Sequence, residues 1–192
     1  MPNIIKKFAL KDGTPIFVKH SEPKDREGIC EFFNLIPKSD LILYRDNISD
    51  QELLVDFISP CDEEKVIELI ALHKNRVIAK GSLHTEAVYW PKAAEIKLVV
   101  SPEYRSKGLG TILFNRLLHE GFKLQVRKIV VRYASGNNSM DKILGNHGFK
   151  PESVLNYNVQ DTDKDINKNL ILASYDLDSW ERRFELYSTI YD

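Results

Sequence analysis

Hydrophobic residues in the first third of the chain recur at intervals that predict one strand and two helices. A turn signal at Asp12-Gly13 precedes a short strand over residues 15–19. The apolar spacing then changes to three and four residues, which predicts a helix over about residues 24–36 whose apolar face is made by Ile29, Phe32, Phe33 and Ile36. Residues 49–52 have the pattern of a capping box, so a second short helix to about Ile58 is expected, as part of a flap.

The middle of the chain has the composition of β-structure. Three strands are predicted, over residues 66–73, 76–85 and 93–101. The polar turn Lys74-Asn75 joins the first two as a hairpin, and the loop of residues 86–92 leads into the third. Because strands joined in succession by such turns run antiparallel, a mostly antiparallel sheet is expected here.

Helical spacing returns after Gly110. A helix of about three turns is predicted from the shared face of Leu113, Phe114, Leu117, Leu118 and Phe122. A β-branched strand follows over residues 128–133, and a second helix over residues 137–147. Two more strands are expected over residues 153–159 and 170–177.

These elements predict an α/β (α+β) fold, with a mixed, mostly antiparallel central sheet flanked by helices. The whole chain, residues 1–192, is expected to form one domain with its core at about residues 14–178. Residues 179–192 have aromatic side chains at helical spacing, so a C-terminal helix is expected. That helix either packs on its own domain or forms a dimerisation or partner-binding tail, so the chain is expected to be a monomer or a homodimer.

The composition supports a folded domain and excludes several classes of protein. The 192 residues are 43% hydrophobic and 29% charged, which is typical of a globular protein and not of a disordered or fibrous one. A net charge of −1 gives no overall field that would attract nucleic acid or an anionic membrane. No apolar stretch has membrane-spanning length and the N-terminus is not signal-like, so a soluble cytoplasmic protein is expected. Cys30 and Cys61 stand outside any CxxC or Cys/His cluster, so no metal site is predicted.

The segment from Arg105 to Thr111 carries the clearest chemical signal, because a predicted strand runs there through a short turn into a helix. The first N–H groups of a helix have no intrahelical acceptor and lie at the positive end of its dipole, so they can hold a phosphate. Gly108 and Gly110 lack the Cβ atoms that would keep a diphosphate away from those amides. Arg105 and Lys107 add local positive charge. The segment therefore predicts a diphosphate site, although a turn and cap without ligand would need the same residues.

Two nucleotide-binding patterns are excluded at this turn. A Rossmann fingerprint requires a third glycine where Leu113 stands, and a Walker A loop requires Gly-Lys followed by Ser or Thr, which is absent. The antiparallel strands that lead into the turn also differ from the parallel units of a dinucleotide-binding fold. An oxidoreductase that uses a nicotinamide coenzyme is therefore not expected.

The run Arg105-Ser106-Lys107-Gly108-Leu109-Gly110 resembles the Arg/Gln-x-x-Gly-x-Gly/Ala signature of the GNAT superfamily of acyl-CoA-dependent N-acetyltransferases. Glu95 in the preceding strand and Asn137 before the second helix follow the order and spacing of that family, so the resemblance spans about residues 65–150. Within the superfamily, the chain is similar to the bacterial Pat-type protein-lysine acetyltransferase group at Leu10-Lys11-Asp12-Gly13, Met140 and Leu144. The resemblance implies a GNAT-like fold.

The resemblance also implies an enzyme that moves acetyl from its co-substrate acetyl-CoA to a primary amine. A protein lysine is the expected acceptor, and a small amine is an alternative. Glu95 would act as the general base, unless it is a solvent-facing or salt-bridged strand residue. The backbone of a bulge at residues 98–100 would bind the thioester carbonyl and open a slot for the pantetheine arm. Coenzyme binding is thus assigned to Leu98, Val99, Val100, Arg105, Ser106, Lys107, Gly108, Leu109, Gly110, Thr111 and Asn137.

Two positions in this assignment leave alternatives open. Asn137 would bind the coenzyme arm or would only cap its helix. Many relatives place a tyrosine, as general acid, where this chain has Leu144. A thiolate with a pKa near 8.5 leaves without much help, and Tyr133, Tyr157 or water could replace the acid, although each tyrosine could equally be a packing residue. A catalytically weak acyl-CoA-binding module therefore stays an alternative to an active enzyme.

Specificity for the acceptor is expected in the loops around the slot, at residues 37–60, 85–92 and 160–168. Their acidic side chains would attract a cationic acceptor or would be ordinary solvated carboxylates, namely Asp40, Asp46, Asp50, Asp56 and Glu86.

Overall fold

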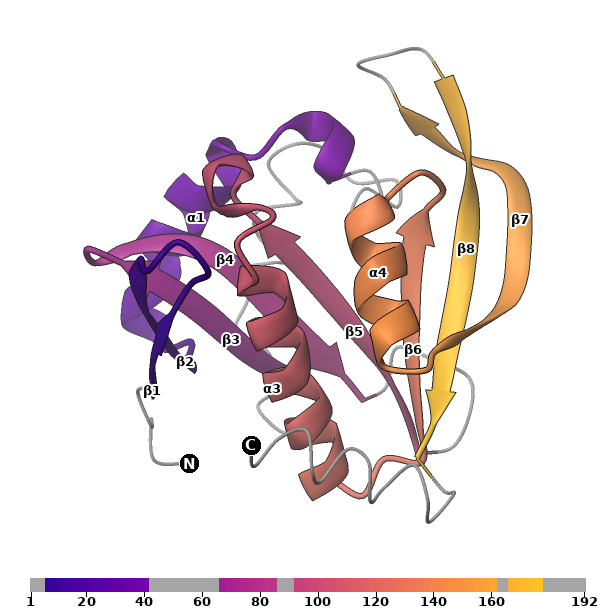
Figure 1. Cartoon of the computed structure of the whole chain (residues 1–192), viewed down its shortest axis with the longest axis horizontal. Coiled ribbons are helices and arrows are strands. Elements are labelled where there is room, and N and C mark those ends of the chain that lie inside the picture. The colour runs from indigo at the N-terminus through magenta and orange to yellow at the C-terminus, as the bar shows by residue number, and fades with distance from the viewer. Residues whose placement is uncertain (1–5, 42–65, 86–91, 162–165, 178–192) are drawn as a thin grey trace.

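An eight-stranded sheet runs through the molecule in the order β1-β2-β3-β4-β5-β6-β8-β7 (Figure 1). The computed structural model describes residues 6–41, 66–85, 92–161 and 166–177. β5 and β6 are parallel, and every other pair of neighbouring strands is antiparallel. The strands are β1 (Lys6–Ala9), β2 (Pro15–His20), β3 (Val66–His73), β4 (Arg76–His84), β5 (Ala93–Val100), β6 (Lys128–Ala134), β7 (Lys150–Asp161) and β8 (Ile166–Asp176).

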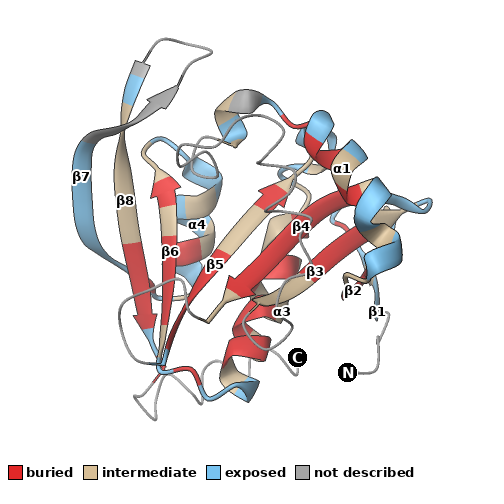
Figure 2. Cartoon of the chain, turned by 180° about the vertical axis from the view of Figure 1, so that it is seen from behind, coloured by how far each residue is buried: buried red, intermediate tan, exposed pale blue. Residues whose placement is uncertain are grey.

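Helices cover both faces of this sheet. The helix α1 (Arg26–Asn34) lies on one face, and α3 (Leu109–Lys123) and α4 (Asn138–Asn146) lie on the other, as the opposite views of Figures 1 and 2 show. Short 3-10 turns precede α1 and follow it at Pro23–Asp25 and Lys38–Asp40, and a third at Pro102–Tyr104 follows β5. The predicted mixed, mostly antiparallel sheet flanked by helices is confirmed.

Each helix is held to the sheet by its apolar face. Under α3, the predicted face is completely or almost completely buried, at Leu113, Phe114, Leu117 and Leu118. Under α1, a second cluster joins the predicted helical face to residues of β3 and β5, namely Ile29, Phe32, Phe33, Ile36, Ile70 and Val99. Burying one such side chain contributes about 1.5–3 kcal/mol, so both layers are fixed mainly by hydrophobic contact (Figure 2).

The described elements agree with the sequence predictions within a few residues, with one addition. β1 was not predicted, because Lys6-Lys7-Phe8-Ala9 has no clear alternation; it forms by pairing with β2 across the Asp12-Gly13 turn. β7 and β8 are longer than predicted. The helices expected over residues 49–58 and 179–192 lie outside the described residues. No helix in the described ranges has the length and apolar character needed to cross a bilayer.

The two parallel strands separate along their length. β5 pairs with β6 only over Ala93–Glu95 and Lys128–Val130. Beyond that point β5 continues beside β4 as far as Val100, while β6 continues beside β8 as far as Ala134. The strands therefore diverge toward their C-terminal ends, as the spreading arrows of Figure 1 show, and one edge of β5 beyond Glu95 has no partner among the described strands.

The bulge expected at residues 98–100 is absent. β5 keeps a constant register with β4, from Glu95 opposite His84 to Val100 opposite Ala79. The register shift lies instead between β3 and β4, where Leu72 pairs with Val77 and Ala71 with Ala79. The separation of β5 from β6 thus arises because each strand stays with its own antiparallel partner, and not because β5 contains an extra residue.

Candidate active site

The loop between β5 and α3 has a backbone shape that depends on glycine. Ser106 has φ +60° and Gly108 has φ +89°, so two of three successive residues are left-handed. Gly108 is the N-cap residue of α3, and a side chain at that φ would cost about 1–2 kcal/mol. Alternation of this kind turns successive N–H groups to the same side of the chain, which forms an anion-binding concavity.

The glycine at position 110 is explained by close packing of α3, and not by the approach of a diphosphate that the sequence suggested. A Cβ at this position would lie 3.3 Å from Ile143 Cδ1 and 3.7 Å from Leu98 Cδ2, on the inner side of the helix. The missing side chain therefore lets the first turn of α3 pack closely against α4 and β5. This contact brings the N-terminus of α3 to the end of β5, where the pairing with β6 has already ended.

Backbone N–H groups with no acceptor among the described helices and strands lie along both sides of this corner. The first intrahelical bond is donated by Ile112 N–H to Gly108 O at 3.1 Å, so the N–H groups of residues 109–111 precede it and lack intrahelical acceptors. On β5, Ser101 N–H donates to Ile78 O of β4 at 3.0 Å. Because N–H groups alternate along a strand, those of Leu98 and Val100 point away from β4 toward the opening, and that of Val99 points toward β4.

The two cations predicted for the loop are both paired with carboxylates from the first part of the chain. Arg105 donates from Nε to Val100 O at 3.1 Å and from Nη2 to Asp40 Oδ2 at 2.5 Å. Lys107 Nζ lies 2.9 Å from Asp12 Oδ2. The hydrogen bond from Lys107, and then those from the hydroxyl and the N–H of Thr14, hold the pKa of Asp12 far below its usual range. The positive charge of this pair of side chains is therefore largely balanced already.

Glu95 is salt-bridged, which was the structural alternative to its predicted role as a base. The side chain is 2% exposed, and Arg132 of β6 donates from Nε to Oε1 at 2.6 Å and from Nη2 to Oε2 at 2.9 Å. A bidentate pair of this kind fixes the plane of the carboxylate. Ala94 and Ile96 pack in the core beneath α3, so Glu95 lies on the opposite face, the face that carries α1.

His84, which the sequence did not single out, stands directly across from Glu95. The two residues are paired in the β4–β5 register, so their side chains are neighbours on the same face. His84 Nε2 lies 2.9 Å from Ser82 Oγ. Burial lowers the pKa of His84 to about 4, and the neighbouring cations Lys97, Lys80 and Arg132 act in the same direction while Glu68 opposes them. A neutral imidazole therefore borders Glu95 at pH 7.

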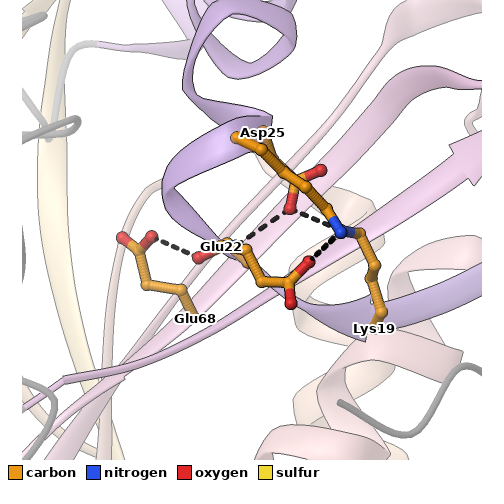
Figure 3. A network of polar contacts seen from close by, with 6 residues as sticks. Lys19, Glu22, Asp25 and Glu68 are labelled. Atoms are coloured by element: carbon orange, nitrogen blue, oxygen red, sulfur yellow. Dashed lines mark hydrogen bonds and ion pairs between the residues drawn. The ribbon is translucent and has the colours of Figure 1, made fainter.

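A second polar network fixes α1 beside this face (Figure 3). Lys19 is 5% exposed and contacts Asp25 Oδ2 at 2.5 Å and Glu22 Oε2 at 3.3 Å. Ser21 Oγ donates to Glu68 Oε2 at 2.9 Å, and Glu68 also forms an ion pair with the buried Lys80. These contacts tie the start of α1 to β2, β3 and β4.

The residues considered for α4 and its surroundings take structural positions. Asn137 Oδ1 accepts from Met140 N–H at 3.1 Å, which is the capping alternative. Leu144 is buried in the core. The hydroxyl of Tyr133 donates to Asp141, and burial together with this hydrogen bond raises the pKa of Tyr133 to about 12. His147 joins α4 to α3 through Asn115 Oδ1 at 2.5 Å.

Several predicted residues lie beyond what the structure describes. They are Asp46, Asp50, Asp56, Glu86 and the side chain of Tyr157. Of the expected acidic residues, Asp40 is described, and it is bound to Arg105. Within the described ranges, no three His, Cys, Asp or Glu side chains are grouped so that they could hold a metal ion.

Comparison with known proteins identifies one family. The model of the acetyltransferase (GNAT) family matches residues 29–149. The fold is similar to that of the ribosomal-protein-S5-alanine acetyltransferase from Vibrio fischeri, with a TM-score of 0.72 and 18% identity over 93% of this chain and 99% of that one. It is also similar to the yncA protein of Salmonella typhimurium, solved with its cofactor acetyl-CoA, with a TM-score of 0.70 and 17% identity over 85% and 95% of the two chains.

A third similar structure is the GNAT domain of PAT from S. lividans, with a TM-score of 0.70 and 16% identity over 90% of this chain and 97% of that one. Of these three proteins, the first is named for its acceptor, an alanine of ribosomal protein S5, and the names of the other two state none. At such identities the likeness shows the fold alone, so the Pat-type resemblance is one of several distant ones.

Proposed function

The chain belongs to the GNAT acetyltransferase family and is an acetyl-CoA-dependent N-acetyltransferase, and on that premise we propose that it acetylates primary amines, with a protein lysine as the first candidate acceptor. The observation that carries the proposal is the corner where the N-terminus of α3 meets the unpaired edge of β5, with Glu95 on the far face of the same strand. The corner supplies donors for a coenzyme, and the far face supplies a carboxylate.

The described residues fit acetyl-CoA as co-substrate. The left-handed Gly108 and the free N–H groups of residues 109–111 are suited to a diphosphate, with Arg105, Ser106 and Lys107 beside them. The N–H groups of Leu98 and Val100 would bind the pantetheine arm and the thioester carbonyl, and Val99 would support the strand between them. Asn137 would then contribute by holding the first turn of α4, in keeping with its bond to Met140 N–H.

The first chemical problem is the proton on the acceptor amine. A lysine amine has a pKa near 10.4, so about one in a few thousand is neutral at pH 7. We assign its removal to Glu95, directly or through one water, because a carboxylate fixed in a plane by Arg132 keeps lone pairs for a further hydrogen bond. The neutral His84 beside it presents no positive charge to the incoming ammonium.

The second chemical problem is the departing thiolate. The amine nitrogen forms a bond to the carbonyl carbon and the carbon–sulfur bond breaks, with the electron pair leaving on sulfur. Leu144 is apolar, and the Tyr133 hydroxyl is bound to Asp141 with a pKa raised to about 12, so neither is a good acid. Since a thiolate with a pKa near 8.5 is a good leaving group, water can protonate it after it leaves.

The test is acetyl transfer from acetyl-CoA to a panel of lysine-bearing proteins, peptides with N-terminal alanine and small amines, read as free thiol and as acetyl groups located by mass spectrometry. Glu95→Gln is expected to lower kcat at least tenfold while the affinity for CoA is preserved. Glu31→Gln, which changes an exposed carboxylate on α1, is the matched control and should leave kcat unchanged.

Three outcomes would each contradict a different part of the proposal. Unchanged turnover in Glu95→Gln would remove Glu95 from the mechanism. Binding of CoA at ordinary affinity with no thiol released by any amine would favour the acyl-CoA-binding module instead. Acetylation of N-terminal alanine or of small amines, with no modified lysine, would leave the enzyme in place and replace the lysine acceptor.

A further inference from the structure

The turn between β1 and β2 lies directly against the loop that begins α3. Lys11 N–H donates to Lys107 O at 3.0 Å, and Asp12 Oδ2 lies 2.9 Å from Lys107 Nζ. Thr14 N–H in turn donates to Asp12 Oδ1 at 3.0 Å, which orients the carboxylate. Two segments almost one hundred residues apart in sequence are therefore joined by backbone and side-chain contacts at this point.

The side chain of Lys11 runs along the N-cap of α3. Its Cγ and Cε lie 3.6 Å, and its Cδ 4.0 Å, from the position that a Cβ on Gly108 would occupy. Since Nζ is bonded to Cε, the ammonium group lies close to Gly108, the residue that precedes the three N–H groups of α3 without intrahelical acceptors. Lys11 is exposed, so its ammonium is available to a ligand.

Charge balance distinguishes Lys11 from the two cations of the loop itself. Arg105 is bound to Asp40, and Lys107 is bound to Asp12. Lys11 has no ion pair in the part of the chain that the structure describes. An anion at the start of α3 would thus lie near Arg105 and Lys107, whose charges are balanced by carboxylates, and near Lys11, whose charge is not balanced by any described residue.

We propose that Lys11 is a coenzyme-binding residue whose ammonium contacts the diphosphate of acetyl-CoA. The inference rests on the proposed function, because it takes the N–H groups of residues 109–111 as the diphosphate site. A lysine supplies a mobile point charge with three donors, which suits a phosphate bound mainly by fixed backbone N–H groups. The backbone bond from Lys11 to Lys107 O fixes where the side chain starts.

The test is calorimetric titration of the full chain with CoA, 3′-dephospho-CoA and pantetheine. Lys11→Met keeps an unbranched side chain as far as Cε and removes the ammonium group, and should raise the Kd of CoA about fivefold to tenfold. Lys11→Arg should stay within about twofold of the wild type, because it keeps the charge. Lys7→Met is the matched control: Lys7 is exposed on β1 of the same hairpin, about 13 Å from Lys11 along an extended chain, and its loss should leave the Kd unchanged.

The ligand series locates the contact. Lys11→Met should raise the Kd of CoA and the Kd of 3′-dephospho-CoA by the same factor. Pantetheine, which has no diphosphate, should bind the variant and the wild type with the same Kd. If Lys11→Met weakened the binding of CoA but not that of 3′-dephospho-CoA, Lys11 would contact the 3′-phosphate instead, and the inference would be overturned. Equal CoA affinity in Lys11→Met and wild type would overturn it too and leave the proposed function standing, whereas a wild type that does not bind CoA would overturn both.

Discussion

Removing the Arg132 side-chain charge while leaving Glu95 in place is expected to destabilise the fold strongly. In Arg132→Met the Glu95 carboxylate, 2% exposed, loses both of its guanidinium hydrogen bonds. Removing one partner of a buried ion pair costs about 3–5 kcal/mol, because the other charge is left uncompensated. Arg132 is itself 34% exposed, so water can replace part of the interaction, and we expect about 2–3 kcal/mol. For a chain of 192 residues this corresponds to a fall in Tm of about 4–12 °C.

Urea unfolding followed by circular dichroism measures this cost, with two comparison variants. Arg132→Met/Glu95→Leu removes both charges of this pair and should recover stability to within about 1 kcal/mol of the wild type, since neither partner leaves an uncompensated charge behind. Lys24→Met breaks an ion pair with Glu22 in which the lysine side chain is 73% exposed, and should cost less than about 1 kcal/mol. If Arg132→Met unfolds within 1 kcal/mol of the wild type, or if the double variant is no more stable than the single one, Glu95 is not the buried, paired charge described above.

Two further predictions follow from the backbone of the loop and from the burial of His84. Gly108→Ala is expected to lower the free energy of unfolding in urea by about 1–2 kcal/mol and to weaken CoA binding, because φ is +89° at this position. Gly145→Ala lies within α4 with open space around its Cβ, and should raise the free energy of unfolding by about 0.5–1 kcal/mol. Equal effects of the two substitutions would contradict the conformational argument. The pKa of His84 is about 4 in the folded protein against 6.5 in the unfolded chain, so below pH 6.5 the unfolded chain binds more protons and stability should decrease from pH 6.5 to pH 4, by up to about 3 kcal/mol. His84→Asn should flatten that decrease in urea midpoints measured between pH 7 and pH 5, and an unchanged slope would assign it to other groups.

The elements themselves could be predicted because their signals are local. The helical spacing of Leu113 to Phe122 and the Asp12-Gly13 turn each depend on residues close together in sequence. The loop from Arg105 to Thr111 could be predicted for the same reason, since its glycines and the following helix are adjacent. β1 was missed because its signal is not local: it is a strand only as the partner of β2.

The partners of the site residues could not be predicted in this way. Arg132 reaches Glu95 only because β5 and β6 start as a parallel pair, and His84 reaches it only through the register of β4 and β5. Lys11 depends on the packing of a turn against a loop almost one hundred residues later in the chain. The first two contacts are fixed by strand order and register, and the third by tertiary packing. The pattern of residues within a single strand or turn carries no information on either.

The separation of β5 from β6 arises from strand pairing rather than from a local irregularity. A bulge would have freed one N–H group by inserting a residue into β5, but β5 is regular throughout its pairing with β4. The N–H groups of Leu98 and Val100 face the opening because β6 follows β8 instead, with pairing that continues to Ala134 opposite Leu170. The backbone donors lie along the edge of this stretch of β5. Because side chains alternate between the two faces of a strand, the Leu98 side chain lies on the face toward α3 and the Glu95 side chain on the face toward α1. In the proposed function, one regular strand would thus serve a coenzyme along its edge and an acceptor on its far face, without a special conformation at either place.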